Sequence, residues 1–496
     1  MNLTPAELDR AVGVLLGTAA GDALGAPYEF GPPRGPELEV AMVGGGSFGW
    51  EPGEWTDDTS MAIAIAEVAA TGADLRDEEA ADALVQRWHE WSQHATDVGV
   101  QTRSVLSRAG RHGITAHTAR TESAALHELS GHTAGNGSLM RTAPLALAYL
   151  DDELGLVQAA RALSELTHWD PDAGDACVLW CLAIRHAVLT GELDVRIGLQ
   201  HIDPHRRDLW ISRLDTAEKS QPSDFRNNGW VVEALQGAWS AIATTPVPVD
   251  DPANGVFRAD HLRLALDAAV RGGYDTDTVA AIAGGLLGAV YGASAIPAQW
   301  RRVLHGWPGL VTWDLVALAT RIVKADRPFS YEPAPMTPVR HPHDDGVWMG
   351  NVATLGALPN DVDAVVSLCR VPEADLPIGV EQLDVRLIDQ LDANDNLDFV
   401  LLDTVRVVEL LRHEGHTVLI HCVQAHSRTP AIAALYGARL HSIDIAEALA
   451  AVCAVLLEAD PNPEFREALR RLHQVQVDTQ MTSDTVLRGD RRKKKN

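Results

Sequence analysis

One hydroxyl and two carboxylates lie together just before an apolar run in the sequence GEWTDDTSMAIAIAE. They belong to Thr56, Asp57 and Asp58, and the run that follows, 61–70, has the length and alanine content of a buried helix. Oxygen ligands at a helix start suit a hard cation such as Mg²⁺, Mn²⁺ or Ca²⁺. The same residues also suit a helix N-cap, where Asp and Thr are favoured without any metal.

A second copy of this pattern, GGYDTDTVAAIAGG, favours the metal. Its acidic and hydroxyl residues, Asp275, Thr276, Asp277 and Thr278, again precede an alanine-rich, helix-like run. If the two stretches face each other across a helical bundle, they bring four carboxylates together. Four buried like charges repel strongly unless cations neutralise them. The pair of motifs therefore predicts a two-metal centre, with the ions about 3.5–4 Å apart.

Five motifs in a fixed order carry a resemblance to a known family. They are GTAAGDALGAPYEF (17–30), WTDDTSMA (55–62), GNGSLMRTAPLAL (135–147), THWDP (167–171) and GGYDTDTVAAIAGGLLGAVYG (272–292). Over roughly residues 8–325 the chain resembles the ADP-ribosylglycohydrolase family, which includes the enzyme that removes ADP-ribose from dinitrogenase reductase. The resemblance implies an all-α domain that hydrolyses the glycosidic bond between ADP-ribose and an acceptor.

The resemblance also implies roles for particular residues. Two Mg²⁺ or Mn²⁺ ions would be held by six oxygen-bearing side chains: Thr56, Asp57, Asp58, Asp275, Asp277 and Thr278. Glu29, in APYEF, would orient or activate the attacking water, although a surface carboxylate at a helix end is the alternative. His168, in THWDP, would line the substrate cleft, and a histidine that only packs at a helix junction fits equally well.

A glycine-flanked asparagine begins the stretch GNGSLMR between two helical patterns. Glycine on both sides of Asn136 lets the backbone approach a ligand and aim N–H groups at it. The helix-like run that follows offers an N-terminus to an anion. A lone GNG would usually be an ordinary turn. The family resemblance makes Asn136, Gly137 and Ser138 candidates for binding ADP-ribose.

Further along the chain the periodicity changes. Short β-branched runs at 363–370, 382–388 and 416–421 alternate with helix-like stretches, which predicts an α/β domain. Within it, HCVQAHSRTP spaces Cys422 and Arg428 as Cys-x5-Arg between a predicted strand and a predicted helix. A thiolate at this helix N-terminus would be stabilised by the dipole and by backbone N–H groups. Arg428 could clamp a phosphate while Cys422 attacks phosphorus and forms a cysteinyl-phosphate.

The run IHC…SRTPAIAALYG resembles the dual-specificity and tyrosine phosphatase superfamily, over roughly residues 340–475. The resemblance implies that Asp389 is the general acid, with Asp392 and Asp395 as substitutes. It also implies that the hydroxyl of Thr429 helps turnover of the intermediate and that no metal is needed.

Ala425 departs from the phosphatase pattern, because the superfamily usually has glycine there. If the position needs a positive φ, alanine costs about 1–2 kcal/mol. A phosphate-binding module without turnover is therefore the alternative for this domain. The corresponding alternative for the whole chain is a sensor that binds ADP-ribose and phosphate and has an inactive phosphatase module.

The length of 496 residues predicts two or three domains. We expect an ADP-ribosylglycohydrolase-like domain at 1–326 and a smaller phosphatase-like domain at 339–478. The proline-rich segment 327–338 would link them, and 479–496 would form a disordered basic tail.

The net charge of −27 argues against general binding of nucleic acid. Five scattered cysteines argue against a disulfide framework. The N-terminus has no apolar signal core, and no apolar run reaches the ~18 residues that span a membrane. We therefore expect a cytoplasmic protein without membrane contact. Its partners would be an ADP-ribosylated acceptor, whose chemical identity stays open, and a phosphorylated target.

Overall fold

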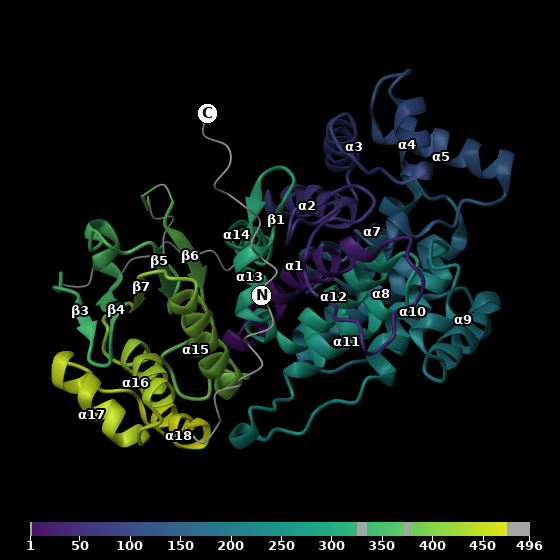
Figure 1. Ribbon diagram of the computed structural model, residues 1–496. Helices are drawn as coiled ribbons and strands as arrows, with labels where there is room; N and C mark the ends of the chain where they lie inside the picture. The colour runs from purple at the N-terminus through teal and green to yellow at the C-terminus, as the bar shows by residue number, and fades with distance from the viewer. Residues whose placement is uncertain (1, 325–334, 372–375, 378, 474–496) are drawn as a thin grey trace. The chain divides into compact units, whose positions relative to one another are not determined.

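The computed structural model describes residues 2–324, 335–371, 376–377 and 379–473 (Figure 1). The chain forms two compact units. The first comprises Met1–Val247, His261–Ile296 and Val303–Asp326, and the second comprises Pro248–Asp260, Pro297–Arg302 and Arg327–Asn496. Most of the expected linker 327–338, and the whole expected tail 479–496, lie outside the described residues.

The first unit is predominantly helical, as the sequence predicts, with one short antiparallel pair of strands, β1 His305–Gly306 and β2 Leu310–Val311. Its helices are α1 Pro5–Gly25, α2 Asp57–Ala70, α3 Glu78–Ser92, α4 Val100–Ala109, α5 Ala116–Ser130, α6 Pro144–Ala148, α7 Glu153–Glu165, α8 Pro171–Thr190, α9 Pro204–Ala217, α10 Val231–Thr244, α11 Asp260–Arg271, α12 Thr276–Tyr291 and α14 Thr312–Ile322.

Helices α1 and α12 pack so closely that their backbones touch. Gly13, Gly17 and Gly21 recur every four residues and therefore share one face of α1. A Cβ added at Gly17 would lie 2.1 Å from the carbonyl oxygen of Gly284, and one added at Gly13 would lie 2.2 Å from that of Gly288. Only glycine fits at these positions. We call this contact the glycine seam; it brings the end of α1 beside the start of α12.

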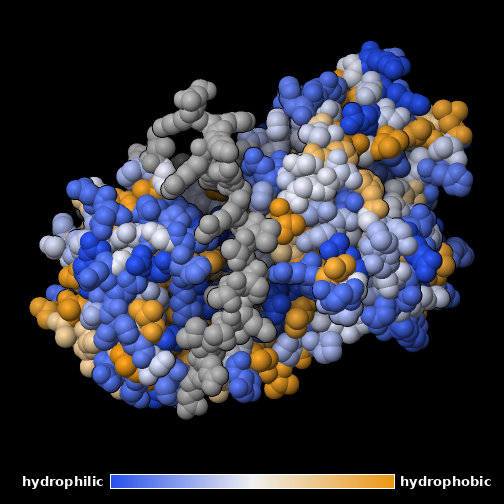
Figure 2. Space-filling view, in the orientation of Figure 1, coloured by the Kyte–Doolittle hydropathy of each residue, from blue (hydrophilic) through white to orange (hydrophobic). Residues whose placement is uncertain are grey.

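Helix α8 is the one described helix that is long and apolar enough to cross a membrane by length and composition, with a mean hydropathy of 1.3. This corrects the expectation that no such run exists. However, 78% of the apolar stretch of α8 that meets this criterion is buried inside the protein, as in the core helix of a large helical domain. On the face shown in Figure 2, hydrophobic residues form small groups scattered among hydrophilic ones.

The second unit contains a five-stranded sheet in the order β3-β4-β7-β5-β6. Its strands are β3 Val339–His341, β4 Asp344–Asn351, β5 Ala364–Ser367, β6 Glu381–Asp384 and β7 Val418–Cys422. Its helices are α13 Ala298–Val303, of which only Val303 is assigned to the first unit, α15 Leu397–His413, α16 Arg428–His441, α17 Ile445–Val455 and α18 Pro463–Leu472. The β3–β4 pair is antiparallel and the other pairs are parallel. The predicted α/β class is confirmed, although β3 and β4 were not expected.

A methyl group in the glycine seam should destabilise the first unit. We expect Gly17→Ala to lower its free energy of unfolding by about 1–3 kcal/mol, because the added Cβ would overlap a backbone carbonyl that cannot move independently. Gly174→Ala in α8 is the matched control, since its nearest neighbour atom is 3.7 Å away in the flexible side chain of Arg161. Urea denaturation measures both, and equal midpoints would contradict the steric argument.

Candidate functional site

Five carboxylates from three parts of the first unit form two groups that share one member. Asp22, Asp58 and Asp277 form the first group, and Glu29, Asp275 and Asp277 form the second. Within each group one oxygen from every residue lies within 4.8 Å of the others. This arrangement suits two cations that share the carboxylate of Asp277. The glycine seam makes the arrangement possible, because it places Asp22 and Glu29 next to the start of α12.

The N-terminal ends of α2 and α12 contribute these carboxylates without using them as ordinary caps. Thr56 is the N-cap residue of α2 but makes no side-chain capping bond. Its hydroxyl lies 3.1 Å from Asp58 and 3.5 Å from Asp277 instead. Asp275 holds the same position on α12, also without a side-chain capping bond. The plain N-cap interpretation therefore does not explain these two motifs.

Asp22 is a member of the first group that our sequence reasoning missed. Its carboxylate accepts hydrogen bonds from the backbone N–H of Thr56 and of Thr59, both at 2.9 Å, and from the Thr59 hydroxyl at 2.6 Å. It therefore fixes the start of α2 against α1. A single aspartate in a Gly/Ala-rich helix has no local pattern that reveals this contact.

Asp97, just before α4, was missed for the same reason. It contributes to the raised pKa of both Glu29 and Asp57, so it lies within electrostatic range of the carboxylates. Asp57 is buried but belongs to neither group of three. The two motifs are therefore not equivalent, since Asp275 and Asp277 both join a group whereas only Asp58 does so from the other motif.

Burial and mutual repulsion strongly disfavour the charged forms of these carboxylates. Burial, followed by the neighbouring aspartates, raises the pKa of Glu29 to about 9. Burial and like charges raise the pKa of Asp58 well above its usual range, and a hydrogen bond from Thr278 offsets this only in part. Asp58 Oδ1 and Glu29 Oε2 are buried without a hydrogen-bond partner among the described residues. An all-oxygen donor set with unpartnered carboxylate oxygens fits divalent cations.

The GNGSLMR loop supports the carboxylates from one side. The Asn136 amide donates to Asp275 Oδ2 at 2.8 Å and to the carbonyl of Asn228 at 2.9 Å. Asn228 in turn accepts from the backbone N–H of Asp275 at 3.1 Å. Asn136 thus holds a carboxylate of the second group, a role that the glycine pattern did not indicate. Asn228 was also missed.

Within this loop, Gly137 packs against His168 and Ser138 points into the interior. A Cβ on Gly137 would lie 3.0 Å from the imidazole of His168, so a larger residue would displace the ring. The Ser138 hydroxyl is buried and accepts from Ser164 at 3.0 Å, which directs this side chain into the interior. His168 is buried beside Thr167, 2.8 Å from its hydroxyl, and burial lowers the histidine pKa well below its usual value. Its imidazole is therefore neutral.

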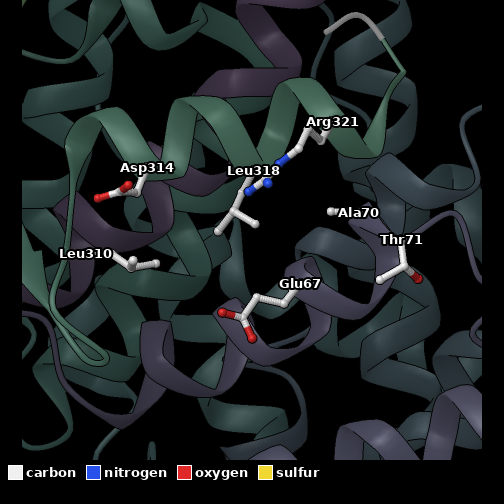
Figure 3. Close-up of a pocket in the computed structure, with 7 residues that line it drawn as sticks. All are labelled: Glu67, Ala70, Thr71, Leu310, Asp314, Leu318 and Arg321. Carbon is white, nitrogen blue, oxygen red and sulfur yellow. The ribbon is translucent and has the colours of Figure 1, made fainter. Parts of the chain in front are cut away.

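A pocket of about 310 Å³ lies elsewhere in the first unit, between α2 and α14 (Figure 3). Glu67 lines it from α2, and Asp314 and Arg321 line it from α14. Glu67 is nine residues beyond Asp58 on the same helix, which is about 14 Å along the axis. This pocket is therefore separate from the carboxylate groups.

In the second unit, the Cys-x5-Arg segment joins a strand to a helix, as the sequence predicts. Strand β7 ends at Cys422, which is buried, and α16 begins at Arg428. Arg428 Nη1 donates to the carbonyls of Leu368 and Leu387 at 3.0 and 3.1 Å. Ala425 has a φ of +58°, so the loop requires the left-handed conformation at this position, which an alanine adopts only with strain.

Asp389 lies against this loop. Its Oδ1 accepts from the Ser427 hydroxyl at 2.7 Å and from the Asn462 amide at 2.9 Å. Asn462, which sequence reasoning missed, also donates its backbone N–H to Ser427 at 3.1 Å. Asp392 and Asp395, the substitutes for Asp389, are exposed, as Asp389 itself is.

Thr429 and His421 flank the segment that connects β7 to α16. The Thr429 hydroxyl is buried without a partner among the described residues. His421 lies 2.7 Å from the Ser367 hydroxyl, and burial lowers the histidine pKa to about 4. The histidine next to Cys422 is therefore neutral.

The chain thus consists of two units. One is helical and brings its carboxylates together at the ends of antiparallel helices, and the other is an α/β unit. Comparison with known proteins identifies the first part: residues 3–328 match the model of the ADP-ribosylglycohydrolase family, and the chain belongs to this family. The predicted resemblance is confirmed.

Two relatives that are named as ADP-ribosyl hydrolases agree with this assignment. ADP-ribosylarginine hydrolase Tri1 of Pseudomonas putida is 34% identical over 307 residues, which cover 60% of this chain and 75% of the relative. The ADP-ribosyl-[dinitrogen reductase] glycohydrolase of Rhodospirillum rubrum is 29% identical over 311 residues, which cover 60% of this chain and 90% of the relative.

Among solved structures, human DUSP28 is 25% identical, covering 29% of this chain and 97% of that chain, with a TM-score of 0.26.

Replacing Ala425 by glycine should stabilise the second unit. We expect the free energy of unfolding to rise by up to about 1 kcal/mol, because relief of the left-handed strain exceeds the extra chain entropy of glycine. Ala450, exposed on α17, is the matched control, and Ala450→Gly should lower stability by about 1 kcal/mol. Two changes of the same sign in urea denaturation would show that Ala425 is not strained.

Proposed function

We propose that the first unit hydrolyses the glycosidic bond between ADP-ribose and a modified protein side chain, with two Mg²⁺ or Mn²⁺ ions. The observation that supports this most directly is the sharing of Asp277 by two carboxylate groups. Divalent cations there would supply positive charge that binds sugar hydroxyls and stabilises an oxocarbenium-like transition state. The residues proposed to hold them are Asp22, Glu29, Asp58, Asp275 and Asp277.

Two residues are proposed to act beside the cations. Glu29 has one oxygen without a partner among the described residues, so it can orient a water and accept its proton as the bond to the acceptor breaks. Asn136 keeps Asp275 in place through its 2.8 Å hydrogen bond. A sensor that binds ADP-ribose without hydrolysis is the alternative. It has no need for an unpartnered glutamate oxygen beside the cations, which favours the enzyme.

The acceptor is proposed to be an arginine side chain. One relative is named an ADP-ribosylarginine hydrolase, and 75% of its length aligns with this chain. A cytoplasmic location is also kept as a proposal. It is supported by the five cysteines, all of them in described residues and all free, because reduced thiols are typical of that compartment.

We propose for the second unit a metal-independent phosphatase activity on a phosphorylated target. In this proposal Cys422 attacks phosphorus, Arg428 binds the phosphate oxygens, and Asp389 protonates the leaving group. Its support is the contact of Asp389 with Ser427, which belongs to the same loop as Cys422. The alternative is a module that only binds phosphate. The loop nevertheless closes with Ala425 in the left-handed conformation, so alanine does not prevent the loop from forming.

The shared ligand gives a test of the metal centre. We expect Asp277→Asn to abolish binding of Mn²⁺ by calorimetry and to reduce ADP-ribose release about 10³-fold, because a loss of several kcal/mol of charge stabilisation affects both proposed ions. Asp57→Asn should have a smaller effect, since Asp57 lies in neither group. ADP-ribose release that is undiminished in EDTA would exclude the proposed metal mechanism. Equal losses in the two variants would return Asp57 to the ligand set.

The phosphatase proposal is tested with phenyl phosphate in EDTA. Cys422→Ser should abolish phosphate release, because a hydroxyl is a far weaker nucleophile than a thiolate. Asp389→Asn should lower the rate by about 10²–10⁴-fold through loss of general acid catalysis. Asp392→Asn should leave the rate unchanged, because the backbone N–H of Asp392 donates to Glu464, whereas the Asp389 carboxylate contacts Ser427 of the loop. If the wild type binds phosphate but releases none from phenyl phosphate, the unit is a binding module.

A further inference from the structure

Two strained residues flank the carboxylates of the second group. Phe30, directly after Glu29, has a φ of +63°, and Tyr274, directly before Asp275, has a φ of +64°. Their backbones are paired: Phe30 donates to the Tyr274 carbonyl at 2.6 Å, and Tyr274 donates to the Gly31 carbonyl at 2.7 Å. Left-handed backbone costs a residue with a side chain about 1–2 kcal/mol. Such strain persists where the surroundings enforce it and concentrates at functional sites.

The strained backbone presents the ring of Phe30 to solvent. Phe30 is 64% exposed although its neighbour Glu29 belongs to the second carboxylate group. Its ring packs edge-on against Phe48 with centroids 6.2 Å apart, and Phe48 packs against Trp50 at 5.8 Å. We call Phe30, Phe48 and Trp50 the aromatic wall.

The glycine-rich loop that carries two of these rings is folded rather than open. Gly45 and Trp50 exchange two backbone hydrogen bonds, at 2.7 and 2.9 Å, and form a tight hairpin. A Cβ on Gly46 would lie 2.8 Å from the carbonyl oxygen of Ala26, so the hairpin packs closely against the end of α1. The loop therefore holds the aromatic wall in a fixed place next to Glu29.

We infer that the aromatic wall receives the acceptor side of the substrate and selects a planar cation there. This inference rests on the proposed hydrolysis. The acceptor is bonded directly to the sugar carbon that is attacked, whereas the adenine is separated from that carbon by the rest of the same ribose, a diphosphate and a second ribose. A wall beside Glu29, the residue proposed to activate the water, therefore faces the acceptor. A guanidinium is planar, cationic and weakly hydrated, and it binds aromatic faces favourably.

The charges around the aromatic wall favour the same occupant. Glu51 directly follows the hairpin; its side chain is 76% exposed and lies 3.3 Å from His305 Nε2. An exposed carboxylate attracts a guanidinium and gains nothing from the neutral hydroxyl of a serine acceptor. It repels a phosphate at a nucleic-acid end.

The test uses the full chain with Mg²⁺ and compares ADP-ribosylarginine with an ADP-ribosylserine peptide. Phe30→Leu keeps an apolar side chain on the same strained backbone but removes the π-face. We expect it to raise KM for ADP-ribosylarginine roughly 2- to 30-fold and to leave kcat and the inhibition constant of free ADP-ribose unchanged. Phe30→Tyr should restore KM. Leu129→Ala, which removes another exposed apolar side chain on α5, is the control and should change neither constant.

Three results would overturn the inference. An equal loss of affinity for free ADP-ribose in Phe30→Leu would assign the wall to the ADP-ribose side. An unchanged KM for ADP-ribosylarginine would show that the aromatic wall does not contact the acceptor. An equal rise in KM for the serine conjugate would show that the wall does not select a cation. If the wild type releases ADP-ribose from neither conjugate, the proposed function fails separately. Calorimetry then tests the aromatic wall independently of hydrolysis. ADP-ribosylarginine must bind more tightly than ADP-ribose, and Phe30→Leu must abolish that difference in affinity.

Discussion

The backbone contact between α1 and α12 is the constraint on which the first unit depends. Glycines at every fourth position of α1 let carbonyl oxygens of α12 come close to its backbone. A Cβ added at Gly13, Gly17 or Gly21 would lie only 2.0–2.2 Å from one of these oxygens. The helices run antiparallel, so this one contact sets Asp22 beside the start of α12. With ordinary side chains in the seam, the helices would separate by several ångströms and the two carboxylate groups would lose their shared member.

Closeness of this kind has an electrostatic cost, which the surrounding hydrogen bonds offset only partly. Burial raises the pKa of Asp22 to about 6 even though Thr56 and Thr59 donate to it. Asp277, which receives repulsion from Glu29 and Asp58 in addition to burial, has a pKa well above its usual range. A fold that gathered these groups for stability alone would have replaced them with apolar residues. Binding of the proposed cations would offset this cost.

The motif-bearing parts of the site could be predicted from sequence because they are local. The alanine-rich composition of two helices predicts where they start, and these starts carry Asp58, Asp275 and Asp277. In the same way, a β-branched run and a helical run enclose Cys422 and Arg428. Contacts between distant segments gave no such signal. Asp22, Asp97, Asn228 and Asn462 join their sites only through tertiary packing, and a lone Asp or Asn in a helix or loop is too common to single out. The strands β3 and β4 were missed because 339–351 lacks a clear alternating pattern.

Both units contain strained backbone near proposed site residues. Of the six described non-glycine residues with positive φ, three lie next to proposed site residues: Phe30 beside Glu29, Tyr274 beside Asp275, and Ala425 between Cys422 and Arg428. In each case a neighbouring element enforces the strain, the Phe30–Tyr274 backbone pair in one unit and the tight strand-to-helix segment in the other. Glycine would remove the steric cost at all three positions. At Phe30 the side chain itself has a proposed use, which accounts for keeping it. Ala425 is itself buried, so its methyl group lies in the packed interior while the loop runs from the end of β7 to the start of α16.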